Sequence, residues 1–228
     1  MTSPKDHGYD GGIMFIGHYG ISFAAKSFEK TIPLWLLFLA VQFVDVVWAI
    51  LVLAGIEKVR IVPGITATNP LDLYYMPYTH SLVGAAVWSL IALAAYKFAR
   101  GGPTAGAVLI GLAVFSHWVL DLIVHIPDLP IYDNSAKVGL GLWNYPATAF
   151  GLEIVFLFGG LVLYIRSSTA RSQIGRFGMP ALAVILVGLQ AIVFFGAPPE
   201  SPSAAAVTAL FAFLLFAALA FWLERYRQ

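Results

Sequence analysis

The sequence contains no cysteine, and this absence removes several kinds of site at once. Disulfide bonds, iron–sulfur clusters and thiolate metal sites all depend on cysteine sulfur. Any metal that this chain binds must therefore be held without a thiolate ligand.

Charged residues are also scarce. Only 11% of the 228 residues are charged and 60% are hydrophobic, whereas about a quarter of the residues in soluble domains are charged. A soluble fold could not cover so much apolar surface, so the bilayer must be the solvent for most of it. The net charge of +1 gives no electrostatic basis for a nucleic-acid partner.

Long apolar runs define the expected fold. A transmembrane helix needs about 20 residues, and six runs meet this length: residues 32–55, 79–99, 104–125, 146–165, 177–197 and 204–223. A shorter run at 13–25 could be a short or tilted span, a re-entrant segment or an interfacial helix. We expect an all-α, polytopic transmembrane helical bundle, with six long helices plus a short N-terminal hydrophobic helix.

The domain organisation follows from the same pattern. Residues 1–12 are polar and lack the features of a signal peptide, so we expect a flexible N-terminal tail. Residues 13–228 form a single transmembrane domain, because no polar segment is long enough for a second one. The two longest connections, residues 56–78 and 126–145, are expected to be loops.

Basic residues predict the orientation in the membrane. If the six long runs alternate, four groups of Lys and Arg fall on one side, which the positive-inside rule makes cytoplasmic. The C-terminus is then cytoplasmic, and the two long loops face the opposite side. The groups are Lys26 and Lys30; Lys97 and Arg100; Arg166, Arg171 and Arg176; and Arg225 and Arg227.

One apolar run carries a polar stripe. His117, Asp121 and His125 recur every four residues, so in a helix their side chains share one face. Ionisable groups at membrane depth normally survive only when they are paired, metal-bound or exposed to a water-filled cavity. The stripe is either a working site or a hydrogen-bonded pair that holds helices together.

Other ionisable residues are expected at a similar depth. At about 1.5 Å per helical residue, Asp45 lies roughly 15 Å and Glu153 roughly 10 Å below the outer ends of their helices. His80 and Ser81 begin the helix before the stripe, where they could line the site or only cap the helix. Four helices thus place ionisable groups in the outer half of the membrane.

These residue types suit a metal ion. Imidazole and carboxylate ligands favour zinc, with manganese or iron as alternatives, and one or two ions are possible. His117 and Asp121 are one turn apart and can share an ion. His125 lies roughly 12 Å along the helix from His117. We therefore expect it to bind a second ion, to contact the substrate or to support a metal ligand through a hydrogen bond.

Four short motifs resemble those of a known family. Gly17-His18-Tyr19, the run from Gln42 to Asp45, the run from Tyr78 to Ser81 and the run from Ser116 to Asp121 look like the inner-membrane metal-dependent hydrolases of the YdjM type. The resemblance covers about residues 14–130. It implies a bacterial-type inner (plasma) membrane location, a distant likeness to zinc-dependent phospholipase C, and metal ligation by His18, Asp45, His80, His117 and Asp121.

The chain departs from that family at two places. The family often has further acidic residues near the position of Asp45, where this chain has Gln42, Val44 and Val46. An arginine commonly precedes its Thr-His-Ser motif, where this chain has Pro77-Tyr78. Either change could alter the number of metal ions or the substrate.

The leading functional expectation is a metal-dependent hydrolase. A bound zinc ion lowers the pKa of its water, and we expect Glu153 or His125 to act as general base or acid. Gln42, Ser81 and Asp128 are expected to line the site, although His125 and Asp128 could be surface groups. The expected partners are membrane lipids and a lipid or lipid-linked phosphoester substrate; Trp48, Trp88 and Trp118 are expected only to pack.

Three alternatives stay open. A metal-ion or proton-coupled transporter would use Asp45 and Glu153 as relay groups, although the sequence shows no repeats or broken helices of the kind that transporters use. A haem protein would use His80 and His117 as axial ligands. A purely structural membrane protein would use the polar residues for packing alone, and the oligomeric state is left open.

Overall fold

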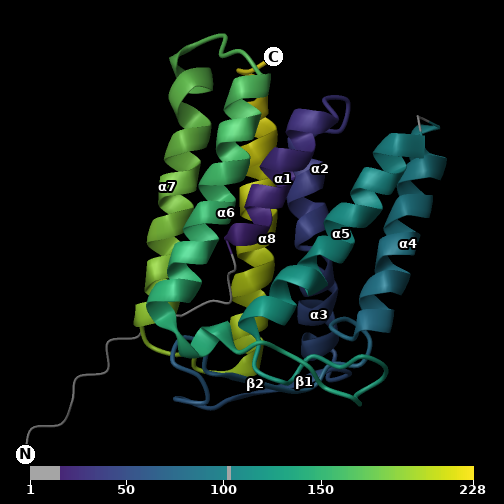
Figure 1. Cartoon of the computed structure of the whole chain (residues 1–228), viewed down its shortest axis with the longest axis vertical. Coiled ribbons are helices and arrows are strands. Elements are labelled where there is room, and N and C mark those ends of the chain that lie inside the picture. Colours follow the sequence, from purple (N-terminus) through teal and green to yellow (C-terminus); the bar gives the residue numbers. More distant parts are fainter. Residues whose placement is uncertain (1–15, 102–103) are drawn as a thin grey trace, which may run out of the picture.

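The computed structural model describes residues 16–101 and 104–228 and confirms the expected all-α bundle (Figure 1). The expected tail, residues 1–12, lies outside the described residues. The described elements are α1 (Gly17–Phe28), α2 (Leu34–Val41), α3 (Phe43–Leu53), β1 (Lys58–Ile61), β2 (Leu71–Tyr75), α4 (Leu82–Arg100), α5 (Thr104–Val124), a 3-10 turn (Leu142–Asn144), α6 (Pro146–Ser167), α7 (Gln173–Phe195) and α8 (Pro202–Glu224).

Five helices, α4 to α8, are each long and apolar enough to cross a membrane. They contain 19 to 23 residues, which at about 1.5 Å per residue matches a hydrocarbon core of roughly 30 Å. The side chains of Ser81, Ser172 and Ser201 cap α4, α7 and α8 by accepting a backbone N–H of the first turn. The chain is therefore a multi-pass membrane protein.

The first long apolar run differs from its prediction. Residues 32–55 do not form one continuous helix: α2 and α3 are separated at Gln42 and bent by 55°. The break gives the Val41 carbonyl a new partner, the Nδ1 atom of His117 at 2.8 Å. Irregular backbone at membrane depth is tolerated where protein surrounds it and satisfies its polar groups, and the imidazole of α5 does so here.

The described part of the short N-terminal run belongs to α1, which lies inside the bundle (Figure 1). Its 12 residues extend only about 18 Å, which is too short to span. α1 packs closely on α6, because a Cβ atom at Gly20 or Gly160 would overlap the backbone of the opposite helix. This contact fixes the depth of His18, in the first turn of α1.

The two long connections form a cap at the end of the bundle opposite the C-terminus (Figure 1). In residues 56–78, which we expected to be loop, β1 and β2 pair as an antiparallel hairpin. Residues 126–145 fold against this hairpin, where Lys137 Nζ donates to the Tyr74 carbonyl at 2.9 Å and Thr68 Oγ1 to the Trp143 carbonyl at 3.0 Å. We call these two segments the cap.

Candidate metal centre

Six ionisable side chains from five parts of the chain gather beneath the cap. They come from the first turn of α1, the first turn of α3, the residue pair before α4, the last two turns of α5 and the residue after α5. All are at least nine-tenths buried: His18, Asp45, His80, His117, Asp121 and His125. The structure therefore brings together all five residues that the resemblance implied as ligands, and adds His125.

Asp121 lies at the centre of this cluster. Its Oδ2 atom is 3.1 Å from His117 Nε2, 3.7 Å from His80 Nε2 and 3.9 Å from His125 Nε2. Its Oδ1 atom is 3.7 Å from His18 Nε2. All four imidazoles therefore present their Nε2 atoms to one carboxylate.

Asp45 contacts two of the same imidazoles. Its Oδ1 atom is 3.2 Å from His80 Nε2 and 3.4 Å from His117 Nε2. Four ligands around a tetrahedral zinc ion, with bonds of about 2.0–2.1 Å, lie about 3.4 Å apart. The separations of Asp45 from His80 and His117, and of Asp121 from His117, are close to that value, and Asp45, His80 and His117 form one group that could hold an ion.

The other ring nitrogen of His117 and His125 is committed to an acceptor. His117 Nδ1 is 2.8 Å from the Val41 carbonyl, and His125 Nδ1 is 2.8 Å from Asp128 Oδ1. Because a carbonyl or an ionised carboxylate can only accept, Nδ1 carries the hydrogen in both rings. In its neutral form each imidazole then offers a lone pair at Nε2.

His80 has the same arrangement through a longer chain of hydrogen bonds. Thr79 Oγ1 donates to Glu57 Oε2 at 2.6 Å, so this hydroxyl can only accept from His80 Nδ1 at 2.8 Å. Glu57 Oε1 also accepts the backbone N–H groups of Tyr78 and Thr79, at 2.9 and 3.0 Å. Sequence reasoning missed Glu57, because its connection to His80 forms only when the cap folds.

These assignments test whether a cation fits the cluster. Three Nε2 lone pairs facing two carboxylates would repel one another unless the imidazoles are protonated or a cation lies between the groups. His117 Nε2 and Asp121 Oδ2 are both buried and, despite their short separation, make no hydrogen bond among the described residues. Ligating histidines typically hold Nδ1–H on an acceptor in this way, so the donor set fits a divalent metal ion.

The carboxylates around His125, at the edge of the cluster, also favour a cation. Burial lowers the pKa of His125, but the Asp128 and Asp121 carboxylates outweigh burial and hold that pKa above its usual value. The site therefore favours a positive charge at this position. A bound cation would supply that charge in place of a proton.

The remaining predicted site residues take other positions. Asp128 orients His125, and Gln42 is buried at the break between α2 and α3. Ser81 caps α4 and donates to the Pro77 carbonyl at 2.7 Å. The expected separation of His125 from His117 by two turns holds along α5, yet both reach the same Asp121 oxygen.

Glu153 occupies a separate place on α6. Its two oxygens accept from the Ile16 backbone N–H and from Gln190 Nε2, each at 3.2 Å. The first N–H groups of a helix have no partner within the helix, and Glu153 holds the start of α1 by accepting one of them. Its contacts support a role in positioning α1, whereas the expected role as general base has no contact to support it.

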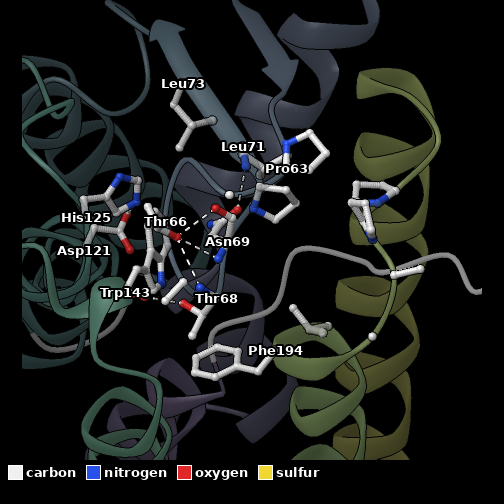
Figure 2. Close-up of a pocket in the computed structure, with 18 of the residues that line it drawn as sticks. Pro63, Thr66, Thr68, Asn69, Leu71, Leu73, Asp121, His125, Trp143 and Phe194 are labelled. Atoms are coloured by element: carbon white, nitrogen blue, oxygen red, sulfur yellow. Dashed lines mark hydrogen bonds and ion pairs between the residues drawn. The ribbon is translucent and has the colours of Figure 1, made fainter.

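A cavity of about 190 Å³ connects the cluster to the surface. Its floor includes Asp45, His80, Asp121 and His125, and its walls come from residues 63–73 of the cap and from the α7–α8 turn. Figure 2 shows Asp121, His125 and Trp143 on one side of this cavity and Phe194 of α7 on another. Among the described residues, no lysine or arginine lines it.

The fold and the site together define a multi-pass helical membrane protein with a buried His/Asp cluster that could hold a metal ion. No protein-family model, curated protein or solved structure matches this chain.

Proposed function

We propose that the chain is a membrane-embedded, metal-dependent hydrolase whose substrate is a lipid or lipid-linked phosphoester. The observation that carries the proposal is the set of Nε2 atoms aimed at Asp45 and Asp121, with Nδ1 held by an acceptor in three of the four rings. Zinc suits these ligands best, with manganese or iron as alternatives. The metal would act as a Lewis acid on the phosphoryl oxygen and lower the pKa of a water molecule.

Charge balance supports two ions when the substrate is anionic. One divalent ion would only neutralise the Asp45 and Asp121 carboxylates, and no lysine or arginine lines the cavity among the described residues. A second ion would leave a net charge of about +2 to compensate the phosphoester. His18, which groups with His117 and Asp121, would supply a further ligand to the second ion.

The cavity walls support an amphiphilic substrate. Polar groups form the floor, while Trp48, Leu71, Leu73, Val193 and Phe194 contribute apolar surface to the walls. The Thr66 and Thr68 hydroxyls donate to backbone carbonyls, which leaves their methyl groups to face other neighbours. The reactive bond would lie at the floor, with the apolar chain against the α7–α8 turn.

His125 is the side chain that we propose for proton transfer. It lies on the floor beside Asp121, and Asp128 fixes its ring through Nδ1. Nε2 could therefore exchange a proton with the attacking water or with the leaving group. If His125 instead holds a second ion, a water molecule must carry the proton.

A metal-ion transporter is the second candidate, because the break between α2 and α3 lies at the cluster. Transporters bind ions at such discontinuous helices, usually in pairs related by an internal repeat. Only one bent pair occurs among the described residues, and this favours the hydrolase. A haem between His80 and His117 fits less well, because Asp45 Oδ1 lies within 3.4 Å of both Nε2 atoms, where the porphyrin would lie.

The proposal is tested by following lipid hydrolysis in proteoliposomes that contain zinc or manganese, with released headgroups and diacylglycerols measured by mass spectrometry. We expect Asp121→Asn to lower the rate by at least about 100-fold, as loss of a catalytic metal would. Asp72→Asn is the matched control, because Asp72 pairs with Arg60 on the cap surface. Uptake of the metal ion into the vesicles, without any product of lipid hydrolysis, would favour the transporter instead.

A further inference from the structure

Trp48 differs from the tryptophans that only support the fold. Trp88 Nε1 donates to the Tyr78 carbonyl and Trp118 Nε1 to the His80 carbonyl, both at 2.9 Å. Trp48 is 2% exposed, and its Nε1 atom has no hydrogen-bond partner among the described residues. A buried donor without a partner is costly, so such an atom in a native fold calls for a functional explanation.

The position of Trp48 supplies that explanation. It follows Asp45 by three residues on α3, so the two side chains share a face of the helix. Its ring lies edge-on to the His80 ring, with centroids 6.2 Å apart. Trp48 also lines the cavity together with Asp45, His80 and Asp121. The indole ring of Trp48 therefore lies beside His80, one of the residues that would hold the metal.

We propose that the Trp48 indole N–H donates a hydrogen bond to an oxygen of the phosphoryl group bound at the centre. This inference rests on the proposed function and adds a residue that recognises the substrate. No lysine or arginine lines the cavity among the described residues, so the metal and this neutral donor would stabilise the oxyanion together. This proposal departs from the expectation that Trp48 only packs.

Trp48→Phe is the matched change, because phenylalanine removes the N–H and keeps an aromatic ring beside His80. The probe is inorganic phosphate, added to metal-loaded protein in detergent and followed by NMR of 15N-labelled indole groups. The Trp48 signal is identified by its loss in Trp48→Phe. Trp88→Phe is the control, because it removes an indole N–H that is bonded outside the cavity.

We expect phosphate to shift the Trp48 signal in a saturable manner and to leave the Trp88 signal unchanged. Trp48→Phe should weaken phosphate binding by roughly tenfold or more, the usual effect of losing a hydrogen bond to a charged group, at unchanged metal content. A Trp48 signal that phosphate does not move, or equal phosphate affinity in Trp48→Phe, would overturn the inference but leave the metal centre intact. If the wild-type protein binds no metal, the proposed function is overturned, and this inference with it.

Discussion

At the scale of single residues, the choice of ring nitrogen decides what the cluster can bind. Val41, Thr79 and Asp128 hold the Nδ1 atoms of His117, His80 and His125, which leaves Nε2 to face the carboxylates. Each of these acceptors contacts Nδ1, on the side of the ring away from the carboxylates of the cluster, as hydrogen-bond acceptors do around metal-binding histidines.

Glu57 gives a direct test of this arrangement. In Glu57→Gln the amide would donate to Thr79, whose hydroxyl would then donate to His80 Nδ1 and move the ring hydrogen to Nε2. We expect metal affinity to fall by about 10–100-fold, the usual effect of changing such a partner, measured by competition with a chelator of known affinity.

Glu29→Gln is the control for that experiment. Glu29 also accepts from a threonine two residues away, through the Thr31 backbone N–H and hydroxyl, but it lies on the surface after α1. The substitution Glu29→Gln should leave the metal affinity unchanged. Equal affinity in Glu57→Gln and the wild type would contradict the role given to Glu57.

The ionisable ligands could be predicted from the sequence because charge is rare in the apolar runs. His117 and Asp121 stand out in their segment, and Asp45 and His80 stand out in theirs. Trp48 and Glu57 could not be predicted in the same way. Their roles depend on contacts with His80 and with the cavity, which the order of residues does not reveal.

At the scale of elements, the close contact of α1 with α6 determines where His18 lies. Gly20 and Gly160 face each other, and a Cβ atom at Gly160 would overlap the Gly20 backbone. Backbone atoms cannot yield as a flexible side chain can. The two helices would have to separate, and His18 would move with α1 away from Asp121.

We therefore expect Gly160→Ala to destabilise the protein by about 1–3 kcal/mol, as overpacking does, and to lower metal affinity. Gly159→Ala is the matched control, because a Cβ atom at Gly159 would meet nothing within 4 Å. Thermal unfolding in detergent, followed by circular dichroism, measures the difference. Equal unfolding temperatures for the two variants would contradict this description of the α1–α6 contact.

The same scale shows which elements the sequence can predict. The helices α4 to α8 follow from uninterrupted apolar runs, because length alone selects a span. The break at Gln42 could not be predicted, since neither glycine nor proline interrupts residues 34–53 and the compensating hydrogen bond comes from α5. The cap hairpin was missed because its two short strands are joined by a long, proline-containing loop.

At the scale of the whole molecule, the two ends of the bundle differ. The cap and the His/Asp cluster lie toward one end, and the C-terminus lies at the other (Figure 1). There the C-terminal residue Gln228 is held to the α6–α7 connection by reciprocal backbone hydrogen bonds with Thr169. Lys26 pairs with Glu224 at 2.5 Å, which joins α1 to α8.

This polarity leads to our proposal for the orientation. Lys97, Arg166, Arg171 and Arg225 belong to the connections and terminus that the positive-inside rule would place in the cytoplasm. The cap would then face the opposite side, and a lipid substrate would reach the centre from the outer leaflet. We propose a bacterial-type inner membrane on the basis of the family resemblance.

The central claim, that the cluster binds a divalent metal, is tested most directly by metal analysis of the purified protein by mass spectrometry. We expect about one or two equivalents of zinc, manganese or iron per chain, with the metal lost in His117→Ala and Asp121→Ala and retained in the control His7→Ala. Metal-free wild-type protein of normal helicity, or equal metal content in all four proteins, would contradict the account.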